Sequence, residues 1–175
     1  MGVFAQRYDA DDAPLGPEFR ANVIEDGKQY HPSVAMLATG GFAIAFHTAP
    51  ADSDERDYEV EVREFDGSGE GLGDEYRMND YTDNGQRMVR IAAGPSGFFG
   101  VWESYGQDGD AYGVYARSYD SAYGLSPTEF QMNASGDRWQ YAPAVAAAAD
   151  GRFVAAWHEN DGMGSFWIRT RVFSP

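Results

Sequence analysis

Internal repetition constrains the fold of this chain more than any other feature of its sequence. Large aromatic residues recur at intervals of 56 and 55 residues, at Phe46, Trp102 and Trp157. A second aromatic series recurs at intervals of 57, 54 and 54 residues, at Tyr8, Phe65, Tyr119 and Phe173. Self-similarity at a fixed period is typical of folds built from repeated supersecondary units that pack against their neighbours. We therefore expect one repeated unit rather than several unrelated domains.

Each period predicts four short strands. The first two strands are joined by tight turns that contain glycine, at Gly40–Gly41, Ser96–Gly97 and Asp150–Gly151. The second strand is almost wholly apolar, as in residues 42–46 and 153–157, which predicts that both of its faces are covered. The third strand alternates in polarity, and the fourth is short and charged, as expected at a sheet edge. The alanine run 146–149 aligns with segments rich in Val and Ile, so we expect strand there and no helix anywhere.

The repeats divide a single domain, 1–175, into four parts. Residues 1–29 are a partial repeat with the third and fourth strands, 30–85 and 86–140 are full repeats, and 141–175 supply the first three strands. Four-stranded antiparallel repeats are typical of β-propeller blades, so the sequence predicts an all-β, β-propeller-like fold. The thirteen expected strands make about three blades with one strand over, whereas propellers have roughly four to eight blades. A six-bladed ring formed by a two-fold homodimer resolves this count. A β-trefoil monomer and a piece of a longer propeller are the alternatives.

Three segments carry a resemblance to a known type of repeat. They are Tyr8-Asp9-Ala10 with Pro14-Leu15-Gly16-Pro17-Glu18-Phe19, then Gln107–Arg117, then Pro143-Ala144-Val145-Ala146. Through them, nearly the whole chain resembles the tandem repeats, about fifty residues long, of large secreted bacterial proteins, including RTX-type calcium-binding adhesins. The resemblance brings no catalytic motif with it. It implies a propeller-type repeat, an extracellular or cell-surface location, and adhesion or surface binding as the function.

Charge and composition exclude several classes of partner and chemistry. Twenty-eight acidic residues against 13 basic ones give a net charge of −15, whereas nucleic acid binding needs a basic surface. The absence of cysteine excludes disulfides, thiolate catalysis and cysteine-based zinc sites. No apolar stretch approaches the roughly 20 residues needed to cross a membrane, and residues 1–7 do not resemble a signal peptide. We therefore expect neither nucleic acid binding nor membrane insertion.

Repeat symmetry nominates a set of polar residues for a binding site. His47, Glu103 and His158 each follow the aromatic residue of a second strand. Imidazole and carboxylate are zinc ligands, but equivalent residues on neighbouring sheets lie roughly 10 Å apart or more, too far for a shared metal. We expect a polar ring around a pocket, or structural hydrogen bonds. The candidates for stacking on a sugar or a protein are aromatic residues in or near loops of the second half, namely Tyr105, Tyr112, Tyr123, Trp139, Tyr141 and Trp167.

The remaining chemistry is sparse. Asp108 and Asp110 flank a glycine and form part of a calcium-loop pattern, but the bidentate Glu of such loops is missing. No motif requires a cofactor, and calcium is the one candidate. Because neither a G-x-S-x-G elbow nor a phosphate-binding loop occurs, no catalytic residue is assigned. The sequence favours a non-enzymatic binding or structural module that recognises a glycan or a partner such as a cell-surface protein. The alternatives are a glycoside hydrolase or lyase that uses carboxylates at the rim, and a module whose only task is oligomerisation.

Overall fold

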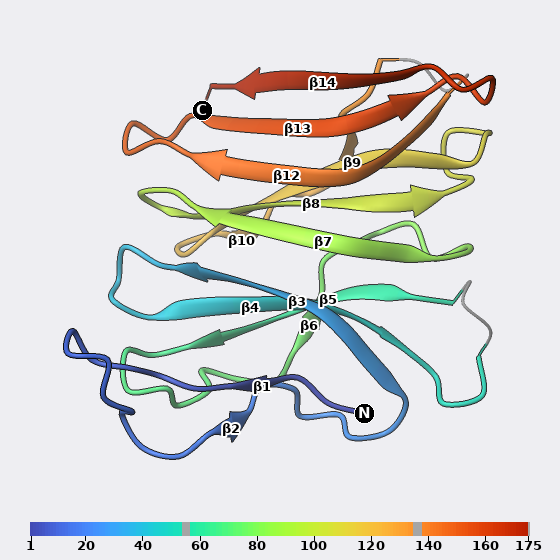
Figure 1. The fold of residues 1–175 in the computed structure, drawn as a ribbon. Coiled ribbons are helices and arrows are strands. Elements are labelled where there is room, and N and C mark those ends of the chain that lie inside the picture. Colours follow the sequence, from blue (N-terminus) through green and yellow to red (C-terminus); the bar gives the residue numbers. More distant parts are fainter. Residues whose placement is uncertain (54–56, 135–137, 175) are drawn as a thin grey trace.

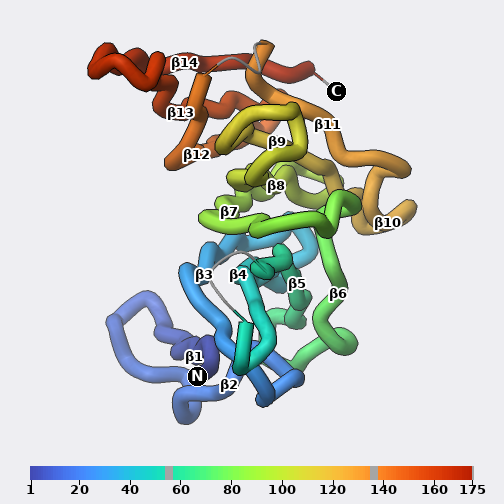
Figure 2. Tube along the Cα trace, turned by 90° about the vertical axis from the view of Figure 1, so that its right-hand side faces the viewer, coloured from blue at the N-terminus to red at the C-terminus, as the bar shows by residue number. Residues whose placement is uncertain are grey.

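A computed structural model describes residues 1–53, 57–134 and 138–174, and within these ranges the chain is all-β, as the sequence predicts. The same ranges contain no helix, and so no helix long and apolar enough to cross a membrane. The strands form antiparallel sheets that lie one above another, with the strands running across the view of Figure 1. Turned by 90°, the chain rises from the N-terminal strands to the C-terminal sheet without returning (Figure 2).

Three principal sheets follow one another along the chain, and we call them the first, second and third sheets. The first consists of β3 (Lys28–Met36), β4 (Phe42–Ala49), β5 (Glu59–Phe65) and β6 (Tyr76–Arg77), in that order. The second consists of β7 (Gln86–Ala93), β8 (Gly97–Tyr105) and β9 (Tyr112–Asp120), with β10 (Gly124–Leu125) and β11 (Phe130–Gln131) both paired to β9. The third consists of β12 (Trp139–Ala147), β13 (Phe153–Asn160) and β14 (Phe166–Phe173). A fourth, two-stranded sheet of β1 (Phe4–Ala5) and β2 (Phe19–Arg20) lies beside the first.

The observed strands agree with the expected ones, with two differences. The structure adds β10, a two-residue strand that the repeat pattern does not contain. The prediction that the second strand of each repeat is covered on both faces holds for β4 and β8, which are buried almost throughout. It is wrong for β13, where Val154 is 40% exposed, because no further sheet lies against it within the described residues.

The core consists of three apolar clusters, each between two neighbouring sheets. The largest joins the first sheet to the second, and Trp102 at its centre is fully buried. A second cluster joins the second sheet to the third around Trp157. A third joins the first sheet to β1 and β2 around Phe46. The recurring aromatic residues of the second strands are therefore core residues, so they are not available as ligand contacts.

The same polar contacts recur in each repeat and tie the sheets together. A buried asparagine accepts the hydrogen bond of a third-strand amide in all three cases, namely Asn22 from Val3 N (2.9 Å), Asn79 from Val60 N (2.8 Å) and Asn133 from Val114 N (3.0 Å). An arginine of each third strand donates to a carbonyl of the preceding sheet, namely Arg63 to Ala21 (2.8 Å), Arg117 to Met78 (3.0 Å) and Arg171 to Met132 (3.1 Å). The repeat in the sequence is thus a repeat of inter-sheet contacts as well as of strands.

Candidate functional site: an aromatic groove across the sheets

A groove of about 680 Å³ crosses the edge of the stack where the first strand of each principal sheet begins. Five aromatic side chains from all three sheets line it, namely Tyr30, Tyr58, Tyr112, Trp139 and Tyr141. Polar side chains lie among them, including His31, His47, Arg87, Glu103 and Asn160. This edge lies on the right-hand side of Figure 1, opposite the turns that join the first and second strands.

A β-bulge in each first strand shapes the groove. The register of β3 against β4 shifts between Tyr30 and Ser33, and β7 and β12 shift at the equivalent positions. At each bulge one non-glycine residue has a positive φ, namely His31 (52°), Met88 (56°) and Ala142 (51°). Such a conformation is uncommon for residues with a side chain and persists only where surrounding contacts hold it.

At two of the three bulges, those of Met88 and Ala142, such a contact comes from the neighbouring sheet. The amide of Met88 donates to Nδ1 of His47 (3.2 Å), and the amide of Ala142 donates to Oε1 of Glu103 (2.7 Å). His47 and Glu103 occupy equivalent positions in β4 and β8, so each is an acceptor for the bulge of the next sheet. The sequence predicted either structural hydrogen bonds or a polar ring around a pocket for these residues. His47 and Glu103 do both, because the side chains that hold the bulges also line the groove.

His47 is held in one tautomer. It is 3% exposed, and its Nδ1 accepts the Met88 amide, which leaves the proton of the neutral ring on Nε2. Burial lowers the pKa of His47 to about 3, and the charges of Arg87 and Arg90 act in the same direction. The ring of His31 lies 5.1 Å away, centroid to centroid, and its charge also lowers the pKa of His47. His47 therefore stays neutral at ordinary pH.

Glu103 is fully engaged by the protein. Its side chain is 4% exposed, one oxygen accepts from Ala142 N, and the other pairs with Arg87 Nε at 2.9 Å. The guanidinium of Arg87 in turn lies over the ring of Tyr112, 4.1 Å from its centroid. Glu103 thus fixes Arg87 and Tyr112 in the wall of the groove, and each of its oxygens already accepts a hydrogen bond from the protein.

The structure brings together only part of the set of residues nominated from the sequence. Of the candidates, His47, Glu103, Tyr112, Trp139 and Tyr141 line the groove. Tyr123 lies outside the lining and is 90% exposed. His158 is exposed on β13 outside the lining, with its ring 5.7 Å from Tyr141. Tyr105 is outside the lining and contacts Tyr112 edge to face, with ring centroids 4.9 Å apart.

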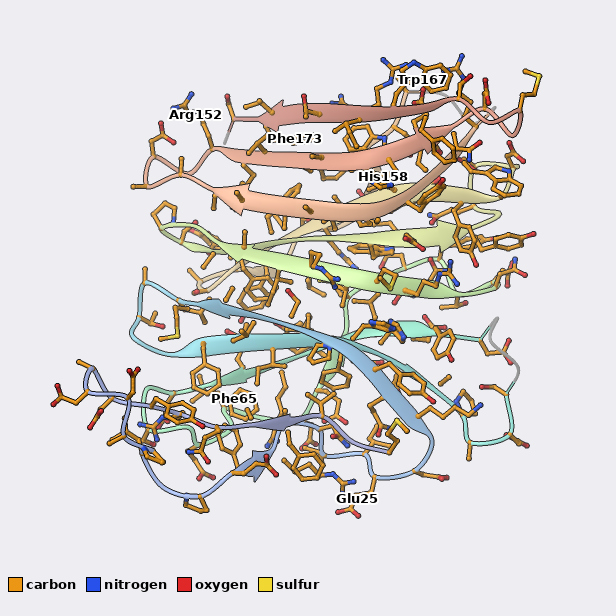
Figure 3. All side chains as sticks on the ribbon, viewed as in Figure 1. Glu25, Phe65, Arg152, His158, Trp167 and Phe173 are labelled. Atoms are coloured by element: carbon orange, nitrogen blue, oxygen red, sulfur yellow. The ribbon has the colours of Figure 1, made fainter. Side chains whose placement is uncertain are left out.

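Trp167 also lies outside the groove, and Figure 3 shows it with His158 on the sheet at the top of the view. The guanidinium of Arg138 lies 4.8 Å from its ring centroid, and that of Arg169 lies 5.9 Å from it. Both arginines pair with Glu159, at 2.8 and 2.9 Å. Trp167 therefore belongs to a separate cluster at the edge of the third sheet.

Sequence reasoning missed several groove residues. His31 had no recognisable partner in the sequence. Tyr58 was not named although it is the repeat counterpart of the candidate Tyr112, since Tyr58 and Tyr112 lie two residues before the equivalent Val60 and Val114. Tyr30 and Arg87 were also missed, and they occupy the positions equivalent to the candidate Tyr141; all three residues directly precede a bulge. An alignment of the repeats would have found this series, because two of its three members are tyrosine.

Asp108 and Asp110 lie in the turn between β8 and β9, away from the groove lining. Oδ2 of Asp108 accepts hydrogen bonds from Gln131 (3.1 Å) and Asn133 (3.3 Å), and Oδ1 accepts from the Asp110 amide (3.4 Å). Asp108 therefore fastens this turn to β11 and the residues after it. Within the described ranges, no three His, Asp or Glu residues group closely enough to hold a metal ion.

Comparison with known proteins shows a likeness to a solved structure. No protein-family model and no curated protein sequence matches the chain. Among solved structures, an endo-arabinase from Bacteroides thetaiotaomicron VPI-5482 superposes with a TM-score of 0.53 over 94% of this chain, at 13% sequence identity. The two chains share a fold. This chain matches 64% of the length of that endo-arabinase, and at 13% identity the likeness concerns the fold alone.

Proposed function

We propose that this chain is a non-enzymatic, glycan-binding module of β-propeller type, and that the aromatic groove is its binding site. The observation that carries the proposal is the convergence of five aromatic side chains and several fixed polar groups in one groove of about 680 Å³. Pockets of this size lined by aromatic and a few polar groups are typical of ligand sites. Flat rings supply stacking surfaces for a sugar, and the Nε2–H of His47 and the amide of Asn160 supply hydrogen bonds for its hydroxyls.

Further observations support the propeller-type fold and the choice of a glycan as the ligand. The stacked four-stranded repeats, and the fold shared with a longer chain, favour segments of a propeller over a β-trefoil. That longer chain is named an endo-arabinase, an enzyme that acts on a glycan, which agrees with a sugar as the ligand here. The resemblance to repeats of secreted proteins favours an extracellular glycan.

The alternative function is a glycoside hydrolase, and the activity named for the structural neighbour is what favours it. Glycoside hydrolysis needs two carboxyl groups, one of them a proton donor, on either side of the scissile bond. Among the described residues, the carboxylate within the groove lining is Glu103, and each of its oxygens accepts a hydrogen bond from the protein. This geometry favours binding without turnover.

A glycan array tests the proposal, with arabinan as the first soluble probe. Trp139, which is 48% exposed, is the residue to change, because its loss removes a stacking surface without opening the core. We expect Trp139→Ala to weaken binding at least tenfold, about 1.4 kcal/mol, as for an aromatic residue at the centre of a contact. The matched control is Tyr123→Ala, an aromatic residue 90% exposed outside the groove, which should bind as the parent does.

Two outcomes would contradict the proposal. Equal binding by the parent and Trp139→Ala would place the ligand elsewhere on the molecule. Release of reducing ends from arabinan or another bound polysaccharide, lost in Glu103→Gln, would establish the hydrolase instead.

A further inference from the structure

The two ends of the stack expose faces that are buried everywhere else in the chain. Val60 and Val114 lie at equivalent positions in β5 and β9, and both are fully buried against the next sheet. Their counterpart in β14, Ile168, is 65% exposed. Apolar neighbours on the same face are also exposed, namely Val154 (40%), Phe166 (64%) and Val172 (62%). The outer face of the third sheet therefore has the composition of an internal face.

The opposite end carries the complementary face. Ile91 of β7 packs against the first sheet and is 6% exposed, whereas its counterpart in β3, Val34, is 63% exposed. Met36, two residues on, is 66% exposed. Both line an apolar pocket of about 530 Å³ between β1 and the strands β3 and β4. This is the place that the first two strands of a preceding sheet would occupy.

Polar groups at the two ends complete the match. His47 and Glu103 each accept the bulge amide of the next sheet, and His158 is the third member of that series. Met88 and Ala142 donate those amides, and His31, which shares their positive φ, is the third member of that series. The unused acceptor thus lies at one end of the stack and the unused donor position at the other.

We propose that these two faces bind each other between two copies of this chain. The third sheet of one copy packs against the first sheet of the other, and His158 accepts the amide of His31 of the partner copy. Two-fold symmetry makes both junctions identical and leaves neither face exposed, which closes six sheets into a ring. The contact uses positions equivalent to those of the two inter-sheet interfaces already present in the chain. It therefore involves the same kinds of apolar packing and the same bulge hydrogen bond.

One strand must move for this contact to form. In the repeat, β1 and β14 are both third strands, so β14 of one copy would occupy the place of β1 in the other. β14 pairs with β13 over eight residues, whereas β1 pairs with β2 over two. β1 is therefore the strand that gives way, and β2 then pairs with β14 of the partner copy. Asn22 would accept the amide of Ile168 there, as Asn79 accepts that of Val60.

Light scattering on the intact 175-residue chain over a range of concentrations tests the proposal. We expect a mass near twice 19.2 kDa, and a dimer that tightens with added sodium chloride, because each copy carries a charge of −15. Val34→Asp and Ile168→Asp should each raise the dissociation constant at least 100-fold. The matched control is Leu72→Asp, since Leu72 is as exposed (66%) but lies on neither face.

Mixing separates a lost contact from a misfolded variant. In an equimolar mixture of Val34→Asp and Ile168→Asp, one of the two junctions combines unaltered faces, so the mixture should associate more tightly than either variant alone. Deletion of residues 1–8 should leave the dimer intact or tighten it. A parent chain that stays monomeric at all concentrations, or a dimer insensitive to both substitutions, would overturn the proposal. Loss of the dimer on deletion of residues 1–8 would overturn the placement of β14.

Discussion

The Nδ1 atom of His47 accepts a hydrogen bond from the backbone amide of Met88, 3.2 Å away on the neighbouring sheet. This bond satisfies an amide that the β-bulge of β7 removes from the strand ladder, and it holds the positive φ of Met88. Glu103 makes the equivalent bond to Ala142 one sheet further along. The residues that join the sheets are thus also those that shape the groove.

This relationship predicts a pH dependence of stability. The pKa of His47 is lowered to about 3 in the folded protein, against an ordinary value of 6.5, because of burial. The unfolded chain therefore binds a proton that the folded chain rejects, so stability is fully present above about pH 6.5 and falls as the pH decreases toward 3. The loss approaches about 1.4 kcal/mol per pH unit within this window.

Urea unfolding at pH 7 and pH 4 measures the effect in the parent and in His47→Gln, which keeps an acceptor for Met88 but cannot titrate. We expect the parent to lose more stability than the variant between these two pH values. An identical loss in both proteins would show that other groups, chiefly the carboxyls, account for the whole acid response.

The titration of Glu61 predicts a pH dependence of folding stability that is opposite in sign to that of His47. Burial raises its pKa to about 7, Glu75 adds to the rise, and Arg77 opposes it. The folded chain then binds a proton that the unfolded chain releases, so this contribution to stability is present below about pH 4.5 and is lost as the pH rises to 7. Glu61→Gln should stabilise the protein at pH 8 by about 1–2 kcal/mol, less than the full shift because solvent reaches part of the side chain. Thermal unfolding at pH 8 and pH 4 measures it, and an equal gain at both would contradict the titration.

Replacement of the buried tryptophans is expected to cause large losses in the free energy of unfolding. Trp102 is 0% and Trp157 5% exposed, so replacement of either by alanine should cost about 3–5 kcal/mol. The indole Nε1 of each is buried without a hydrogen-bond partner in the described part of the chain. Trp102→Phe should therefore cost less than Trp102→Ala by several kcal/mol, since it keeps most of the ring volume and loses no hydrogen bond. Urea midpoints compare the variants, and a loss below about 1 kcal/mol for both alanine replacements would be inconsistent with a core role.

The effect of calcium on the melting temperature tests whether Asp108 and Asp110 form a calcium site. Ions that bind only the folded state raise the melting temperature by mass action, whereas simple salt relieves repulsion at a net charge of −15. Because Asp108 is already bonded to Gln131 and Asn133, we expect millimolar calcium to raise the melting temperature no more than sodium chloride of equal ionic strength. A calcium-specific rise that survives high sodium chloride and disappears in Asp110→Asn would establish a binding site in this turn.

Most strands were predictable because their signals are local. Alternation of polarity, the apolar second strands and the glycine turns each depend on residues a few positions apart. The repeat extended these assignments to the alanine run 146–149, of which the first two residues belong to β12 and the last two lie in the turn that follows. It also indicated that Phe46, Trp102 and Trp157 share one environment, and all three are buried.

The groove was only partly predictable, because its members meet through contacts between sheets. Repeat equivalence placed His47, Glu103 and His158 together, yet His158 lies on the last sheet and has no following bulge to hold in the described chain. His31 has no distinguishing neighbours in the sequence, and the bulge of β3 brings it to the groove. Tyr58, just before β5, could have been found as the repeat counterpart of Tyr112, which also lines the groove. The identity and equivalence of the strands can be read from the residues alone, since both depend on local pattern. Which side chains share a site depends instead on bulges and on whether a neighbouring sheet covers each face, and these are properties of the folded chain.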